Sequence, residues 1–159
     1  MRKRMLSFAA ILLIPASCAG ERQDRWGAGS GPDFCAASRE SEDEPLGVIL
    51  GEAGASGIAL FAPALADFSA GVEYRDVALR IDGAPVRARA FGALFRERGG
   101  IEFNFDVRRV VRRNPNGFTL SVHRGDSRIY ETRVGESAKA ALGTLLECDR
   151  TRRVARGRA

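Results

Sequence analysis

The chain has 159 residues, of which 45% are hydrophobic and nine are Phe, and its formal net charge is +5. This length and apolar content suit one ordinary domain with one core. The positive charge lies near the two ends, in residues 2–4 and among the last ten residues, while the segment between them is acidic overall. A terminal distribution does not form the basic surface of a nucleic-acid-binding domain, so we expect no nucleic-acid partner.

Residues 1–19 have the layout of a bacterial export signal. Arg2, Lys3 and Arg4 precede an apolar run over residues 5–14, which Pro15 and small residues follow. Ten residues span only about 15 Å as a helix, roughly half of a bilayer's hydrocarbon core. We therefore expect a periplasmic or secreted protein with no transmembrane helix in the mature chain.

Two processing routes are open at the end of this signal. Cleavage after Ala19 would release a soluble protein, since small residues occupy the positions that a signal peptidase reads. Residues 15–18 also resemble a lipoprotein box, although Pro15 stands where an aliphatic residue is usual. In that case Cys18 would be lipidated in an outer-membrane lipoprotein. The polar, glycine-rich residues 20–33 are expected to be a flexible N-terminal segment, a tether or a frayed end.

Cys35 and Cys148 are the only thiols of a soluble mature form. In an oxidising compartment we expect them to form a disulfide. The chain-entropy model assigns such a long loop closure roughly 4 to 5 kcal/mol of stabilisation. A CxxC motif and a cysteine-histidine pair are absent from the sequence, so a reactive thiol is not expected.

Alternating apolar residues and turn residues predict short strands in the first two thirds of the chain. Strands are expected at 34–37, 46–50 and 58–62, with an acidic loop at 40–45 and one helical turn at 63–68. Asp82 and Gly83 predict a turn that joins strands 77–81 and 86–91 into a hairpin.

The remaining third combines strands with two helices. Residues 101–105 alternate as a strand, residues 107–113 have helical spacing, and residues 114–117 end that helix. Strands 118–122 and 128–134 form a second expected hairpin. Ser137 is the expected N-cap of a helix that runs to about Cys148. The arginine-rich residues 150–159 are expected to be a disordered tail.

This pattern predicts a mainly β (α+β) fold. About eight short strands and one clear helix favour an antiparallel β-sandwich, or a strongly curved sheet, with a packed C-terminal helix. The expected single domain covers residues 34–149. The disulfide would join its first strand to its last helix.

Several of these features are shared with known exported proteins. Trp26 stands shortly before Cys35, and residues 135–138 lead through Leu142 and Leu145 to Cys148. Over about residues 26–149 the chain resembles small exported alphaproteobacterial proteins of the invasion-associated locus B family. The resemblance implies a periplasmic or surface accessory protein without enzymatic activity.

His123 is the only histidine, which excludes any site that needs two. Ser121, Asp126 and Ser127 are close to it in sequence, but a catalytic triad also needs an acid that orients the histidine. Strand alternation places His123 on the outer face of a hairpin. We expect a solvated side chain there, and we interpret the Arg-Gly-Asp tripeptide at 124–126 as turn chemistry.

No cofactor or metal site is expected from the remaining motifs. The cluster Glu40, Glu42, Asp43 and Glu44 lacks the alternating ligands and central glycine of an EF-hand loop, so we interpret it as a solvated acidic loop. Gly51, Gly54 and Gly57 lack the lysine and the helix of a phosphate-binding loop.

Four arginines flank the valines of the short helix, at positions 108, 109, 112 and 113. Arg108, Arg109, Arg112 and Arg113 could contact an anionic membrane surface or form the solvated side of a core-packed helix. Both interpretations remain open at the level of sequence.

Three functional hypotheses follow. The first is a non-enzymatic periplasmic accessory or binding protein with an unknown ligand and an envelope or protein partner. The second is an envelope or surface protein anchored by a lipid on Cys18. The third is a hydrolase whose site is built from Asp, Glu and Arg.

Overall fold

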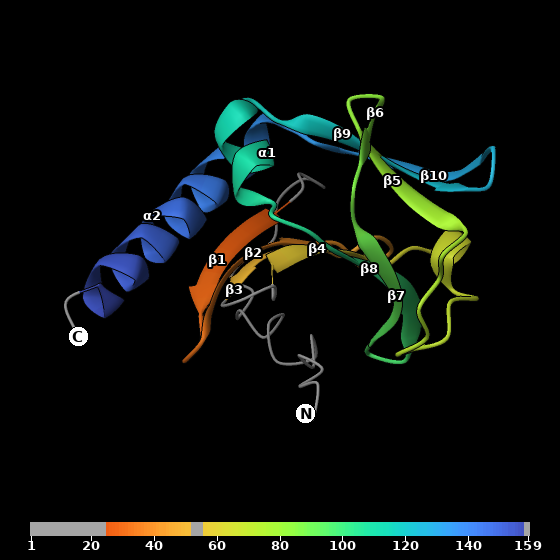
Figure 1. The fold of residues 1–159 in the computed structure, drawn as a ribbon, viewed down its shortest axis with the longest axis horizontal. Helices are drawn as coiled ribbons and strands as arrows, with labels where there is room; N and C mark the ends of the chain where they lie inside the picture. Colours follow the sequence, from red (N-terminus) through yellow and green to blue (C-terminus); the bar gives the residue numbers. More distant parts are fainter. Residues whose placement is uncertain (1–24, 52–55, 158–159) are drawn as a thin grey trace.

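Two antiparallel sheets face each other, and a long helix packs along one edge of the pair (Figure 1). The computed structural model describes residues 25–51 and 56–157. The expected export signal and Cys18 lie outside these residues. None of the described helices is long and apolar enough to cross a membrane. The expected mainly β fold, with two packed sheets and a C-terminal helix, is confirmed.

The described residues form ten strands rather than about eight. The larger sheet has six strands in the order β1 (Arg25–Ser30), β2 (Phe34–Glu40), β3 (Leu46–Gly51), β4 (Ser56–Leu60), β8 (Arg98–Asn104) and β7 (Arg89–Phe95). The smaller sheet has four strands in the order β10 (Ser127–Val134), β9 (Phe118–Arg124), β5 (Val77–Ile81) and β6 (Ala84–Val86).

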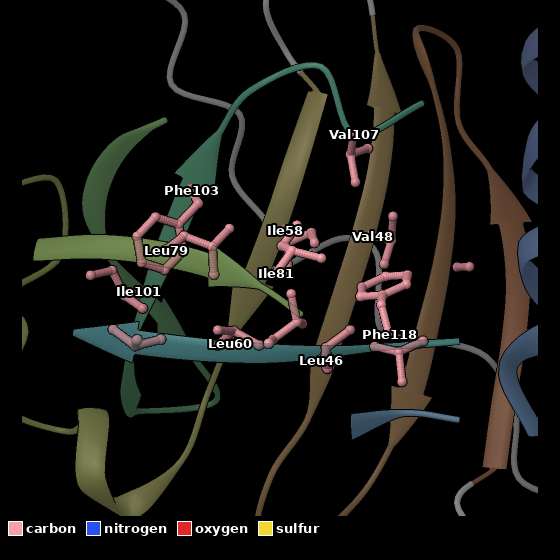
Figure 2. Close-up of a cluster of buried hydrophobic side chains, with 14 of the residues drawn as sticks. Leu46, Val48, Ile58, Leu60, Leu79, Ile81, Ile101, Phe103, Val107 and Phe118 are labelled. Carbon is pink, nitrogen blue, oxygen red and sulfur yellow. The ribbon is translucent and has the colours of Figure 1, made fainter. Parts of the chain in front are cut away.

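The main core lies between the two sheets. Because strand side chains alternate between faces, each strand sends every second residue inward. Figure 2 shows side chains from both sheets meeting there, including Leu46, Val48, Ile58, Leu60, Ile101 and Phe103 from the larger sheet and Leu79, Ile81 and Phe118 from the smaller one. Leu65, in the 3-10 turn η2 (Pro63–Leu65), and Phe68 extend this core.

Both predicted hairpins form, but the first is shorter than expected. Strand β5 pairs with β6 and β9 pairs with β10. The predicted strand 86–91 is wrong, because β6 ends at Val86 and Arg89 starts β7 in the other sheet. There β7 pairs with β8 through seven residue pairs, against three for β5 and β6. The longer pairing outweighs continuation of the short hairpin.

The expected flexible segment 20–33 is corrected by strand β1. Residues 25–30 pair with β2 from Arg25 opposite Glu40 to Ser30 opposite Cys35. Trp26 and Ala28 pack against the main core. Their burial stabilises a glycine-rich strand whose intrinsic β propensity is low. The folded domain therefore includes residues N-terminal to the expected boundary at 34.

The expected disordered tail is corrected by the C-terminal helix. Helix α2 covers Lys139–Arg156, after a 3-10 turn η3 (Glu136–Ala138), and Ser137 makes no side-chain cap. Arg150 pairs with Glu147 one turn earlier, and Arg152 Nη1 donates to the carbonyl oxygen of Phe34 at 2.7 Å. These contacts carry the helix beyond Cys148 and through most of the arginine-rich segment.

The expected disulfide is confirmed. Cys35 and Cys148 have an S–S distance of 1.98 Å and a Cα–Cα distance of 6.1 Å. The bond joins β2 to α2, as the sequence predicted. Ala141, Leu142 and Leu145 of the same helix contribute to the main core, so α2 is held both covalently and by apolar packing.

Candidate functional site

The four arginines of helix α1 (Arg108–Arg113) do not form one basic surface. Arg109, Arg112 and Arg113 are exposed, whereas the Arg108 side chain is only 17% exposed. The assignment of Arg108 to an anionic-surface contact is therefore wrong. Its guanidinium is directed at α2, because a buried carboxylate there provides a stronger partner than water.

Arg108 forms a bidentate ion pair with Asp149. Its Nε lies 3.1 Å from Oδ2 and its Nη2 lies 3.0 Å from Oδ1, while Nη2 also donates to the Gly51 carbonyl oxygen at 3.1 Å. The hydrogen bond to Asp149 raises the pKa of Arg108. Arg153 Nε contacts the same carboxylate at 3.0 Å. This cluster joins α1, α2 and the end of β3, which is a structural role.

A polar hollow of about 420 Å³ lies on the outer face of the four-stranded sheet. Its side chains point outward because the alternate residues Leu79, Leu120 and Val122 are buried in the core. The hollow is lined by Arg80, Gly83, Thr119, Ser121, His123, Asp126, Arg128 and Glu131. Strands β5, β9 and β10 thus bring together the histidine and serine that the sequence singled out.

Ser121 and His123 form a hydrogen-bonded pair in this hollow. The Ser121 Oγ and His123 Nε2 atoms are 3.2 Å apart. Glu131 lies opposite Ser121 in the strand register, but its carboxylate accepts a hydrogen bond from Arg128 Nη1 at 2.7 Å. Within the described residues no carboxylate is hydrogen-bonded to His123. The pair therefore lacks the orienting acid of a nucleophilic triad.

No family model, curated protein or solved structure matches this chain. The hollow and the other surfaces are therefore interpreted from their own geometry.

The Arg-Gly-Asp tripeptide lies at the exposed tip between β9 and β10, where Gly125 adopts a φ of 57°. Arg124 is held by Asp76, since its Nε lies 2.7 Å from Oδ2, and this hydrogen bond lowers the pKa of Asp76. Its guanidinium also lies 5.8 Å from the Phe68 ring centroid. These contacts fit the interpretation of the tripeptide as turn chemistry.

The acidic loop is only partly solvated. Glu42 and Asp43 are exposed, but Glu44 Oε2 accepts a hydrogen bond from the Tyr130 hydroxyl at 3.1 Å. The Glu44 carbonyl oxygen also accepts from Arg39 Nη2 at 3.0 Å. In the described part of the chain, no group of three or more histidine, cysteine or acidic residues is placed to hold a metal ion. Glu44 instead docks the loop against β2 and β10.

Sequence reasoning missed the buried charges at Arg39 and Glu102. Arg39 is 4% exposed, and its Nη1 donates to Thr132 Oγ1 at 3.0 Å across the two sheets. Strand alternation could have found it, since Arg39 follows Cys35 and Ala37 on the inner face. Burial raises the pKa of Glu102 to about 7.

Proposed function

We propose that this protein is an exported, non-enzymatic accessory or binding protein of the bacterial envelope. The polar hollow on the four-stranded sheet carries this proposal. It offers a hydroxyl, an imidazole and side chains of both charges, and Arg80 forms no ion pair with another described residue. Groups of this kind on a rigid sheet suit recognition of a polar, charged partner surface.

The chemistry of the hollow favours binding over catalysis. Ser121 is 6% exposed, so its hydroxyl offers little surface to an incoming substrate. His123 shares its Nε2 with that hydroxyl and has no acid beside it among the described residues. General-base activation of a serine works best when an acid holds the imidazole in the required tautomer.

The disulfide and the N-terminal sequence support export. A bond between Cys35 and Cys148 persists in an oxidising compartment such as the periplasm. Lipid anchoring at Cys18 stays an alternative, because residues 15–18 resemble a lipoprotein box. Incorporation of a palmitate analogue that disappears in Cys18→Ala would establish the anchor, and no incorporation into the unmodified chain would exclude it.

Kinship with the invasion-associated locus B family is part of this proposal. It is supported by the early tryptophan, the terminal helix and the cysteine pair, of which Trp26 contributes to the core and Cys148 to the disulfide. A solved structure of a family member with a different strand order in its two sheets would contradict this kinship.

The proposed binding surface is tested by capture from periplasmic extract of the native host. The bait is the immobilised protein, compared with Arg80→Ala/His123→Ala in the hollow and with Arg109→Ala/Arg112→Ala on α1 as a control. We expect a retained partner to be lost with the hollow variant and kept with the control. Equal capture by all three proteins would contradict the proposal.

A further inference from the structure

The six-stranded sheet carries a second apolar cluster on its outer face, separate from the main core. In a two-sheet sandwich the outward side chains are ordinarily polar. Here they are alanine, isoleucine and phenylalanine, and Phe61 and Phe95 contact each other with ring centroids 5.5 Å apart. The cluster consists of Ala36, Ile49, Ala59, Phe61, Ala93 and Phe95, with Phe34 packed against it.

These side chains are buried, although no described element lies over them. Ala59 is 0% exposed and Ile49 is 3% exposed. Among the described residues, α1 and the four-stranded sheet lie on the opposite side of the six-stranded sheet (Figure 1). The buried side chains of α2 belong to the main core. The outer face therefore requires a cover that comes from elsewhere.

The strand register places small residues in a row across this face. Gly27 lies opposite Ser38, Ser38 opposite Gly47, and Gly47 opposite Ala59. We call these four residues the small-residue row. It continues to Glu102 on β8, which lies opposite Ala59. Glycine and alanine let an apolar segment approach the sheet backbone closely.

Two polar groups are associated with the small-residue row. Ser38 is 1% exposed, and its Oγ has no hydrogen-bond partner in the described part of the chain. A buried hydroxyl without a partner is costly, which indicates that a further group belongs beside it. Glu102 is half-buried at the far end of the row. A fitting occupant is apolar along most of its length and cationic beyond Ala59.

We propose that the apolar residues 5–14 of this chain cover the outer face of the six-stranded sheet while they remain attached. The described chain begins at Arg25, on the edge strand where the small-residue row starts. Residues 15–24 can span up to about 33 Å, whereas the row from β1 to β8 measures about 19 Å. The apolar run can therefore reach every strand of the row.

Charge supports the same direction of the chain. The apolar run is preceded by Arg2, Lys3 and Arg4, and it is followed by the segment that leads to β1. If the run crosses the sheet from β1, its cationic end reaches β8, where Glu102 is the carboxylate of this face. Removal of residues 1–19 would then expose an apolar face. The proposal does not require export, so it can fail independently of the proposed function.

Thiol labelling of the full-length chain tests this proposal. In a Cys18→Ser background, Ala59→Cys probes the covered face, and Ala78→Cys is the matched control. Ala78 is an exposed alanine that points outward from β5. We expect maleimide to label Ala59→Cys far more slowly than Ala78→Cys. Adding Leu12→Asp/Leu13→Asp should accelerate the first reaction roughly tenfold or more and leave the second unchanged.

Three outcomes would overturn the proposal. Fast labelling of Ala59→Cys in the full-length chain would show that the face is open. Slow labelling that Leu12→Asp/Leu13→Asp does not change would exclude residues 5–14 as the cover. Protection that disappears on dilution would identify a second copy as the occupant. If Ala59→Cys does not fold, Ala36→Cys on β2 reports on the same face, since Ala36 is 3% exposed.

Discussion

Single charged residues hold distant parts of this protein together. Asp149 is 5% exposed and accepts hydrogen bonds from Arg108, which lies 41 positions earlier in the chain. Arg39 links β2 to β10 through Thr132, 93 positions away. Both arginines had sequence contexts typical of solvated residues. Their structural roles depend on partners that sequence proximity does not reveal.

Arg108→Ala should lower the free energy of unfolding by about 3 kcal/mol, because it leaves a buried carboxylate with one partner fewer. Arg153 still contacts Asp149, which limits the loss. The measurement is urea denaturation followed by circular dichroism. The control Arg109→Ala removes an exposed arginine from the same helix and should change stability by no more than about 0.5 kcal/mol. Equal effects of the two variants would contradict the structural role of Arg108.

Glu102 makes stability depend on pH. Burial raises its pKa to about 7 in the folded protein, above the ordinary value of 4.5. Its stabilising contribution is therefore fully present below the unfolded pKa and is lost as pH rises through the folded value. Glu102→Gln should be more stable than the unmodified protein by about 1 kcal/mol at about pH 8, after allowing for partial exposure, and nearly equal to it at about pH 4.

Urea unfolding of both proteins across this pH range measures the effect. A stability difference between the two proteins that does not grow between the acidic and the basic end would show that Glu102 titrates normally. Asn104 is its neighbour on the same face of β8, and their hydrogen bond opposes the effect of burial.

At the scale of elements, hairpins were predictable where glycine marks the turn. Gly83, with a φ of 80°, and Gly125, with a φ of 57°, stand at the two predicted turns. The hairpin between β7 and β8 turns at Arg96 and Glu97, which adopt φ angles of 46° and 65°. Such angles favour glycine or asparagine, so two long charged residues provide no turn signal.

Gly117 should be required where α1 leads into β9. Its φ is 105°, and an added Cβ would collide with the carbonyl oxygen of Val134. Gly117→Ala should therefore destabilise the fold by about 1 to 3 kcal/mol. Gly143 in α2 has open space around it, so Gly143→Ala should stabilise the protein by up to about 1 kcal/mol. Thermal unfolding of both variants measures the contrast, and a loss of stability in both would contradict it.

At the scale of the whole molecule, the disulfide connects residues 113 positions apart. It closes the chain around nearly the entire sandwich, from β2 to α2. A closed loop of this length restricts the unfolded chain strongly, so most of the stabilisation arises in the unfolded state.

Replacing both cysteines, Cys35→Ser with Cys148→Ser, should lower the free energy of unfolding by roughly 4 to 5 kcal/mol in the chain-entropy model. Denaturant titration measures this loss. The unmodified protein with its disulfide reduced serves as the control and should behave like the double variant. A loss below about 1 kcal/mol would mean that apolar packing of α2 holds the two ends without help from the bond.

The mainly β class, most strand positions, the C-terminal helix and the cysteine pairing could be predicted from sequence. Alternation and turn residues are local signals, and Cys35 and Cys148 had no competing thiol within the expected domain. The sheet to which each strand belongs was decided only by tertiary structure, as β7 shows when it leaves β6 to pair with β8. The same holds for the Ser121 and His123 hollow and for the burial of Arg108. These features depend on contacts between residues far apart in the chain, and local patterns carry no information about such contacts.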